Sequence, residues 1–365
     1  MKFIIPIMML ALLLIYVLWH IWALLPLPAY GKWLLVTIVA ACFSTEFLGF
    51  TGTLDKMSLG WASFFYNLGN KSIIILFYLL IAFILLDLGR LVRLVPRELL
   101  HDNLTVSIVL TVLMACIAIY GSIHYHHKQR VELTADSHGR LSQPLQVVMV
   151  SDLHIGYHNR RVDLAKWIDL INSEHPDIVL IAGDIVDFSM HPVFEEEMAA
   201  EFRRLEAPVY ACLGNHEYFS DKQKAQQFYK DAGINLLVDS MVNIKGLTII
   251  GRDDRMNPHR KPLSQFSIPD SGKTDLQFMP YTILLDHQPY NLEEAAKAGI
   301  DFQFSGHTHR GQIWPLSWIT DAMYECSWGS LSKGKTQYYI SSGLGIWGAK
   351  YRIGTQSEYV VLTIK

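Results

Sequence analysis

The stretch LQVVMVSDLHIGYH, residues 145–158, places two side chains that often bind metal ions, Asp152 and His154, directly after a short apolar run. The run is brief and rich in β-branched residues, which is typical of a buried strand. An amphipathic helical pattern follows at residues 160–175, and DIVLIAGD, residues 177–184, predicts a second buried strand. Strands that alternate with helices in this way predict a layered α/β domain.

Acidic, imidazole and amide groups recur after the later predicted strands of this domain. They lie in the motifs GDIVD (183–187), GNHE (214–217), DHQP (286–289) and GHTH (306–309). Open α/β sheets place their ligand sites outside the carboxyl ends of their strands, so we expect these motifs to converge. Any one of these turns is a weak signal, whereas all of them in this order are specific.

The motifs together resemble those of the calcineurin-like metallophosphoesterase family. The pattern D-x-H, G-D-x-x-D, G-N-H-D/E, H and G-H-x-H is complete here and spans most of residues 147–310. The resemblance implies an α/β layered fold, a β-sandwich flanked by helices, over residues 145–365. It also implies hydrolysis of phosphate ester or pyrophosphate bonds with two divalent metal ions as cofactors.

The resemblance implies a set of seven metal ligands, one of which bridges the two ions. Two divalent ions close together polarise a phosphoryl group and acidify a water molecule, so a carboxylate must lie between them. The bridge is Asp184; one ion is completed by Asp152, His154 and His309, and the other by Asn215, His287 and His307. Histidine nitrogen and carboxylate oxygen suit Mn, Fe or Zn better than the all-oxygen sites of Ca.

Four further residues are assigned roles at the site, His216 and Glu217 from the same resemblance. His216 stabilises charge on the transferred phosphoryl group or protonates the leaving oxygen, and Glu217 orients its imidazole and raises its pKa. Asp187 holds the site from behind the ligands. Arg310 follows GHTH directly and is expected to bind substrate, because a guanidinium suits a phosphate group. The polar stretch 252–275 is long enough to form a cap over the site.

Apolar residues are concentrated at the start of the chain. A hydrophobic content of 51% with a mean hydropathy of +0.21 is high for a wholly soluble protein. A helix needs about 20 apolar residues to cross a ~30 Å hydrocarbon core. Four stretches have about this length, namely residues 3–25, 33–53, 72–95 and 104–123. We therefore predict a helical membrane anchor over residues 1–125, followed by a polar linker at residues 126–144.

The anchor raises two questions, the role of Glu46 and the side of the membrane. Glu46 lies inside the second predicted span, where an ionisable group is expensive; it marks a contact with a lipid substrate or another helix, or is a protonated packing residue. Lysine and arginine are nearly balanced between the two sides, and GRLVRLVPR, residues 89–97, is the densest cluster in a short loop. If that loop is cytoplasmic, this multi-pass protein of the cell membrane has an extracytoplasmic catalytic domain.

Charge and cysteine content exclude several classes of function. A net charge of −3 and a pI near 6.6 provide no basic field, so no nucleic-acid partner is expected. The four cysteines are scattered and indicate neither a disulfide framework nor a cysteine zinc site. The expected partners are the bilayer and a phosphate-containing substrate.

The membrane anchor favours a lipid-linked substrate, such as the UDP-linked acylated sugar that some members of the family cleave at its pyrophosphate. The alternative is a non-catalytic membrane receptor or scaffold that retains the metal site. A zinc hydrolase of the β-lactamase type is disfavoured because its H-x-H-x-D-H run does not occur.

Overall fold

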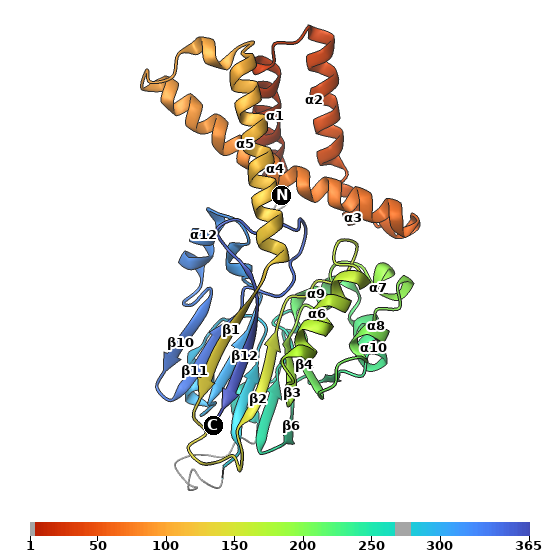
Figure 1. Cartoon of the computed structure of the whole chain (residues 1–365), viewed down its shortest axis with the longest axis vertical. Helices are drawn as coiled ribbons and strands as arrows, with labels where there is room; N and C mark the ends of the chain where they lie inside the picture. The colour runs from red at the N-terminus through yellow and green to blue at the C-terminus, as the bar shows by residue number, and fades with distance from the viewer. Residues whose placement is uncertain (1–3, 267–278) are drawn as a thin grey trace. The chain divides into compact units, whose positions relative to one another are not determined.

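The computed structural model describes residues 4–266 and 279–365 and divides into two compact units (Figure 1). The helical unit comprises Met1–Ser122 and Gly348–Lys350, and the α/β unit comprises Ile123–Trp347 and Tyr351–Lys365. Residues 267–275 of the expected cap lie outside the described part of the chain.

The helical unit consists of long apolar helices joined by short connections. Its α-helices are α1 (Ile4–Leu24), α2 (Ala29–Ser44), α3 (Phe47–Phe50), α4 (Leu59–Leu91) and α5 (Leu104–His126); two 3₁₀ turns are η1 (Leu54–Lys56) and η2 (Arg97–Leu100). Apolar side chains that include Val17, Phe43 and Phe83 form the core of this unit.

Three of the four predicted spans correspond to helical segments that are long and apolar enough to cross a membrane. Within the described residues these are Ala29–Phe50, Leu59–Leu91 and Leu104–His126. The first predicted span corresponds to α1, in which Ala11–Leu24 is a shorter apolar helix. A helical, apolar N-terminal region is therefore confirmed, with three candidate spans by length and composition.

Two acidic residues of the helical unit, Glu46 and Asp87, lie at helix contacts. Glu46 joins α2 to α3, and a Cβ added at Gly69 of α4 would lie 2.5 Å from the Glu46 backbone nitrogen, so glycine permits this close helix approach. Asp87 of α4 accepts a hydrogen bond from the Tyr16 hydroxyl at 2.8 Å and lies 3.1 Å from His20 Nε2. The Asp87 carboxylate is thus paired inside the unit.

Within the described residues, the α/β unit contains two six-stranded sheets. In order across the first sheet the strands are β1 (Lys128–Ala135), β12 (Ser357–Ile364), β2 (Leu145–Val150), β3 (Ile178–Ala182), β4 (Val209–Cys212) and β5 (Asn235–Leu236). Across the second they are β10 (Gly329–Lys333), β11 (Thr336–Ile340), β9 (Phe302–Ser305), β8 (Tyr281–Leu285), β7 (Leu247–Gly251) and β6 (Ser240–Ile244).

Helices and 3₁₀ turns connect these strands. They are α6 (Arg161–Ser173), α7 (His191–Glu195), α8 (Ala199–Phe202), α9 (Asn215–Ser220), α10 (Lys222–Asp231), η3 (Leu263–Gln265), α11 (Glu293–Lys297), η5 (His309–Gly311) and α12 (Leu316–Met323).

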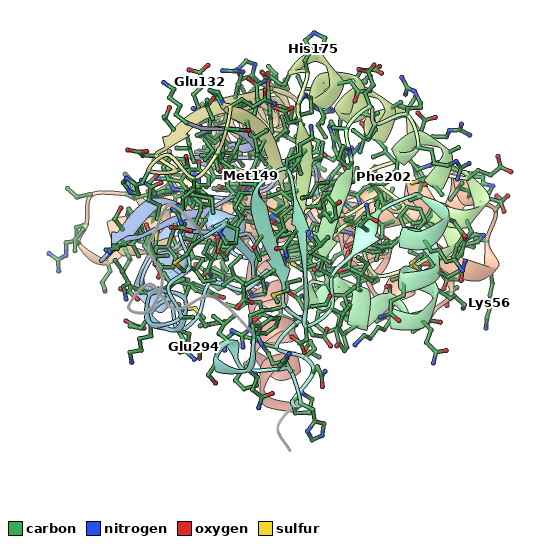
Figure 2. All side chains as sticks on the ribbon, turned by 90° about the horizontal axis from the view of Figure 1, so that it is seen from below. Lys56, Glu132, Met149, His175, Phe202 and Glu294 are labelled. Carbon is green, nitrogen blue, oxygen red and sulfur yellow. The ribbon has the colours of Figure 1, made fainter. Side chains whose placement is uncertain are left out.

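Alternation along the strands builds a layered core. Val147 and Met149 of β2 pack into the apolar cluster shared by the two sheets, whereas Val148 and Val150 pack against α6, α8 and α10. Figure 2 shows Met149 among the interior side chains. Because residues two apart share one face of a strand, a fully apolar strand serves two layers at once. The predicted β-sandwich flanked by helices is confirmed.

One strand lies within residues 126–144, which we expected to be a linker. Strand β1 pairs in parallel with β12 along its whole length, from Lys128 opposite Ser357 to Ala135 opposite Ile364. Val131, Leu133 and Ala135 face the core, and Glu132 between them is exposed (Figure 2). This period-2 alternation is typical of an edge strand with one buried face. The many charged residues make the segment polar overall, and for this reason we expected a linker.

Candidate metal centre

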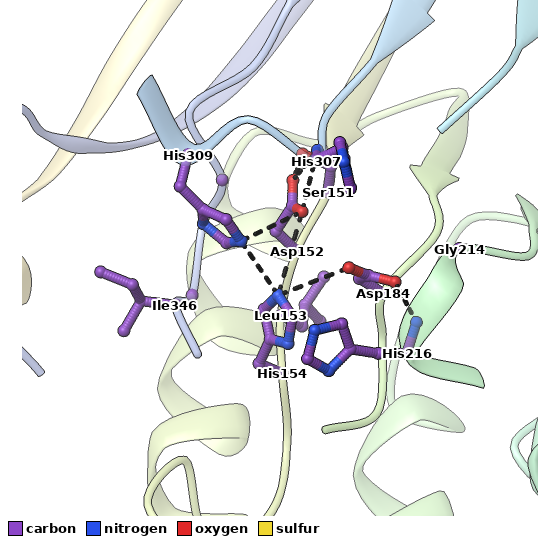
Figure 3. A network of polar contacts seen from close by, with 12 residues as sticks. Ser151, Asp152, Leu153, His154, Asp184, Gly214, His216, His307, His309 and Ile346 are labelled. Atoms are coloured by element: carbon purple, nitrogen blue, oxygen red, sulfur yellow. Dashed lines mark hydrogen bonds and ion pairs between the residues drawn. The ribbon is translucent and has the colours of Figure 1, made fainter. Parts of the chain in front are cut away.

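Five loops that follow strand ends supply the site. Strands β2, β3 and β4 run parallel in the first sheet, and β8 and β9 run parallel in the second, so each set has its carboxyl ends at one edge. The loops begin at Ser151, Gly183, Leu213, Asp286 and Gly306. Figure 3 shows residues from four of these loops meeting around Asp152 and Asp184.

The loops hold several ligand candidates in an uncommon backbone conformation. The φ angles of five of these residues are positive, at 55° for Asp152, 46° for His154, 51° for Asp184, 71° for His307 and 48° for His309. Residues other than glycine seldom adopt this region, and each costs roughly 1–3 kcal/mol that the surrounding packing must offset. Such strain clusters at functional sites.

Two glycines allow the backbone to approach the carboxylates. A Cβ at Gly214 would lie 2.2 Å from Asp184 Oδ1, and a Cβ at Gly306 would lie 2.2 Å from Asp152 Oδ2. The backbone nitrogen of His307 donates to Asp152 Oδ1 at 3.0 Å. Any larger residue at either glycine would therefore displace a carboxylate of the site.

Asp152, His154 and His309 form the first group of donors. His154 Nε2 lies 3.1 Å from His309 Nε2, and Asp152 Oδ1 lies 3.5 Å from His309 Nε2 and 3.9 Å from His154 Nε2. Burial, followed by the charge of His154, lowers the pKa of His309 well below its usual value, which favours a neutral ring with a free lone pair. Nitrogen lone pairs that face each other beside a carboxylate suit a cation between them.

Asp184, Asn215, His287 and His307 form the second group. His287 Nε2 lies 3.1 Å from Asp184 Oδ2 and 3.2 Å from Asn215 Oδ1. The Nδ1 atom of His287 lies 2.7 Å from the carbonyl oxygen of Ala182, a contact that places the proton on Nδ1 and leaves Nε2 to face the group. Burial and the neighbouring His287 lower the pKa of His307 to about 3, so its imidazole is neutral.

Asp184 lies between the two groups. Its Oδ2 is 3.1 Å from His287 Nε2 in one group and 3.7 Å from His154 Nε2 in the other. Burial opposes ionisation, but the imidazoles of His287, His216 and His154 lower the pKa of Asp184 well below its usual value. Its Oδ1 accepts a hydrogen bond from the His216 backbone nitrogen at 2.8 Å, which fixes the orientation of the carboxylate.

The seven residues fit two divalent cations. Asp152, His154 and His309 have ligand atoms within 4.8 Å of one another, and so do Asp184, His287 and His307. Six of the seven residues are buried, and His307 is half-buried. Buried carboxylates and imidazoles without a counter-ion would be costly, and a cation resolves that cost. The structure therefore brings together every ligand that the resemblance implied.

Asp187 contacts three histidines beneath the donors. Its Oδ1 lies 3.3 Å from His216 Nδ1 and 3.4 Å from His154 Nδ1, and its Oδ2 lies 3.8 Å from His158 Nδ1. Burial opposes ionisation, but the contacts with His154 and His216 lower the pKa of Asp187 far below its usual value. An anionic Asp187 orients one metal-ligand candidate and His216 together.

Glu217 contacts backbone groups and not the His216 ring, although its charge contributes to raising the pKa of His216 as predicted. Glu217 accepts hydrogen bonds from the backbone nitrogens of Gly214 at 2.7 Å, Ile185 at 2.8 Å, Asp184 at 3.1 Å and Val186 at 3.2 Å. Glu217 directly follows His216 in α9, and adjacent helical side chains do not face each other. The carboxylate that contacts the His216 ring is Asp187, and Glu217 joins two of the loops through their backbones.

Two arginines lie near the GHTH turn, Arg310, which the sequence indicated, and Arg352, which it did not. The Arg310 guanidinium stacks on Trp328, 4.0 Å from the ring centre. Arg352, which no motif indicated, is fully buried and donates to the carbonyl oxygens of His309 at 2.7 Å, Gly345 at 3.2 Å and Ser342. Burial lowers the pKa of Arg352 to about 10, so the group stays charged. Arg352 thus fixes the backbone of a ligand candidate.

Comparison with known proteins places the chain in a family. A family model described as calcineurin-like phosphoesterase matches residues 145–311. An uncharacterised metallophosphoesterase from Campylobacter jejuni is 30% identical over 260 residues, which are 70% of this chain and 68% of that protein. The chain therefore belongs to the calcineurin-like metallophosphoesterase family.

Some relatives are named as transmembrane proteins. A transmembrane protein with metallophosphoesterase domain from Danio rerio is 25% identical over 312 residues, 80% of this chain and 71% of that protein. This share exceeds what the α/β unit alone makes up, so the match extends into the helical unit. Among solved structures, a 5'-nucleotidase precursor from Thermus thermophilus covers 60% of this chain and 55% of that chain at 15% identity, with a TM-score of 0.37.

Proposed function

We propose that the protein is a membrane-anchored, binuclear metal-dependent phosphoesterase that hydrolyses phosphate ester or pyrophosphate bonds. The observation that supports this most directly is the position of Asp184, whose Oδ2 lies 3.1 Å from His287 Nε2 and 3.7 Å from His154 Nε2. A carboxylate shared by two donor groups is what a pair of neighbouring divalent ions requires. The family membership gives the same reaction class.

The donor residues would hold two ions of Mn, Fe or Zn, which suit mixed nitrogen and oxygen ligands. Bound ions of this kind polarise a phosphoryl group and lower the pKa of water. Asp152, His154 and His309 would hold one ion, and Asn215, His287 and His307 the other, with Asp184 between them.

His216 would protonate the leaving oxygen or stabilise charge on the phosphoryl group. Burial opposes protonation, but Asp184 and the contact with Asp187 raise the pKa of His216 above its ordinary value. A protonated imidazole held by a carboxylate on one side has its other nitrogen available as an acid. Arg310 is the candidate for contact with a further phosphate group of the substrate.

The apolar helices favour a substrate that resides in the bilayer. In the part of the chain that the structure describes, three helical segments are long and apolar enough to span a membrane, and relatives are named as transmembrane proteins. We propose a multi-pass protein of the cell membrane with its α/β unit outside the cytoplasm, acting on a lipid-linked phosphate such as a UDP-linked acylated sugar. Tethering to the bilayer raises the effective concentration of such a substrate.

Purified full-length protein in detergent tests the proposal. Metal content is measured, the protein is stripped with EDTA, and Mn, Zn or Fe is returned. Hydrolysis of p-nitrophenyl phosphate, phospholipids, UDP-linked acyl sugars, polyprenyl phosphates and nucleotides is then followed. We expect two ions per chain and metal-dependent turnover. Two ions without turnover of any substrate would support the receptor or scaffold alternative, and a chain that binds no metal would overturn both.

A further inference from the structure

Two phenylalanines lie against the imidazole of His216. The ring centre of Phe188 is 4.7 Å from that of His216, and the ring centre of Phe219 is 5.4 Å from it. The two phenylalanine rings lie nearly parallel, at 10° with centres 5.9 Å apart. Phe188 follows Asp187 in the loop after β3, and Phe219 belongs to α9, so separate segments supply the pair.

Both rings reach solvent although the imidazole beside them is buried. Phe188 is 43% exposed and Phe219 is 47% exposed, whereas His216 is 6% exposed. A single exposed apolar side chain is ordinary. Two stacked rings that flank one buried acid candidate instead form a partly exposed apolar surface beside it.

The chemistry of the proposed reaction determines what lies beside His216. Water supplies the oxygen that forms the new bond to phosphorus, and the bond between phosphorus and the leaving oxygen breaks. The leaving oxygen takes a proton from His216; one proton of the water restores His216, and the other stays on the phosphate product. The substituent on the leaving oxygen must therefore extend from within hydrogen-bond reach of His216.

We propose that Phe188 and Phe219 form an apolar platform that binds an alkyl or acyl chain on the leaving group. This inference rests on the proposed phosphoesterase function and narrows its substrates to those whose leaving group carries an apolar chain. A chain lying on the two rings is removed from water, and the gain increases with each methylene group. A short or polar substituent gains nothing from this surface, so the platform confers selectivity.

A role in holding His216 in position must be distinguished from the platform role of the two rings. A positioning role acts on the imidazole, so its loss lowers kcat for every substrate by the same factor. A platform acts on the substrate, so its loss lowers kcat/KM only where an apolar chain is present. The ratio of two substrates separates the two roles.

Hexyl phosphate and methyl phosphate provide this ratio, because both are alkyl monoesters whose leaving oxygens are similar in basicity. Full-length protein reconstituted with Mn is assayed by release of inorganic phosphate. We expect the wild-type protein to favour hexyl phosphate about tenfold or more in kcat/KM. Phe188→Ala combined with Phe219→Ala should reduce this preference to about unity, and Phe188→Leu, which keeps an apolar side chain, should retain most of it.

Phe194→Ala is the matched control, because Phe194 is also 43% exposed but lies in α7. It should leave the preference unchanged. A preference that survives in the double variant, or an equal loss on both substrates, would overturn the platform. Equal wild-type rates on the two esters would overturn the platform alone, and so would protein that hydrolyses other substrates of the panel but neither of these esters. No hydrolysis of any substrate would overturn the proposed function and the platform with it.

Discussion

The helical unit and the edge of the α/β unit that carries the metal centre (the metal-centre edge) differ in which side chains they bury. The helical unit exposes large apolar side chains, with Trp33 at 62%, Leu34 at 63% and Leu91 at 78%. The metal-centre edge buries charged groups almost completely, with Asp184 at 1% and Arg352 at 0%. Each arrangement is unfavourable in water alone, so each indicates the surroundings that it requires.

The difference shows what stabilises each region. Exposed apolar side chains are favourable in hydrocarbon. Hydrocarbon cannot form hydrogen bonds with backbone groups, so only helices and closed barrels, which pair these groups internally, are stable there. Buried charges are favourable where other charges and hydrogen bonds neutralise them. The helical unit therefore depends on its solvent, and the metal centre on the completeness of its polar network. Changes to that network should have the larger effects on activity.

Asp184→Asn is expected to have the largest effect. The bridge loses its charge where two cations lie closest, so hydrolysis of p-nitrophenyl phosphate should fall by about 10³-fold or more, with loss of bound metal. Turnover and metal content per chain are measured together. Asp87→Asn, the same change in the helical unit, should leave turnover of this soluble ester unchanged. A variant at Asp184 that keeps two ions and normal turnover would show that the ligand assignment is wrong.

His216→Ala should separate acid from ligand. Loss of a general acid or charge stabiliser lowers kcat by roughly 10²- to 10⁴-fold while the ions stay bound. Metal analysis of the variant accompanies the kinetics, and His175→Ala, at an exposed histidine after α6, serves as control. Loss of an ion in the His216 variant would instead make this residue a ligand.

The family and the fold class could be predicted because the signals are local. Each motif follows an apolar strand, and parallel strands bring their carboxyl ends to one edge. The apolar spans are equally local, since hydropathy over about 20 residues indicates them. These local signals were sufficient to predict that His154 lies near His309 and that Asp184 lies near His287.

Other contacts of the site could not be predicted, because they depend on where side chains point in the fold and not on the order of residues in the sequence. Glu217 is the sequence neighbour of His216, but their side chains diverge in α9, and Asp187 reaches the ring from another loop. Arg352 lies far along the chain from the carbonyl that it contacts at His309, and no motif marks it. Strand β1 had a period-2 signal in Val131, Leu133 and Ala135, which the polar character of the segment outweighed.

Arg352→Met should test whether the buried network stabilises the fold as well as the site. Removing the guanidinium leaves the carbonyl oxygens of His309, Ser342 and Gly345 without this donor, which should cost about 3 kcal/mol of unfolding free energy. Thermal unfolding of the full-length protein measures the loss. Arg203→Met is the matched control: Arg203 also donates to a backbone carbonyl, that of Asp231, but is exposed, so its loss should cost below about 0.5 kcal/mol. Equal losses would show that burial of the charge does not matter here.

The smallest expected effect concerns β1, the strand expected to be a linker. Glu174 accepts from Arg130 of β1 through Nε at 2.8 Å and Nη2 at 2.9 Å, and from the Tyr359 hydroxyl of β12 at 2.8 Å. The contact with Arg130 lowers the pKa of Glu174. Because the folded pKa is the lower one, the stabilisation is present above the unfolded value of about 4.3 and is lost as pH falls through the folded pKa. Arg130 is 38% exposed, so solvent screens the pair.

Glu174→Gln should therefore cost only about 1 kcal/mol near pH 7, and the difference from wild type should vanish in acid. Denaturant unfolding at several pH values measures it, with Glu195→Gln, at an exposed carboxylate of α7, as control. A cost that is independent of pH would show that β1 is held by its pairing with β12 and not by this ion pair.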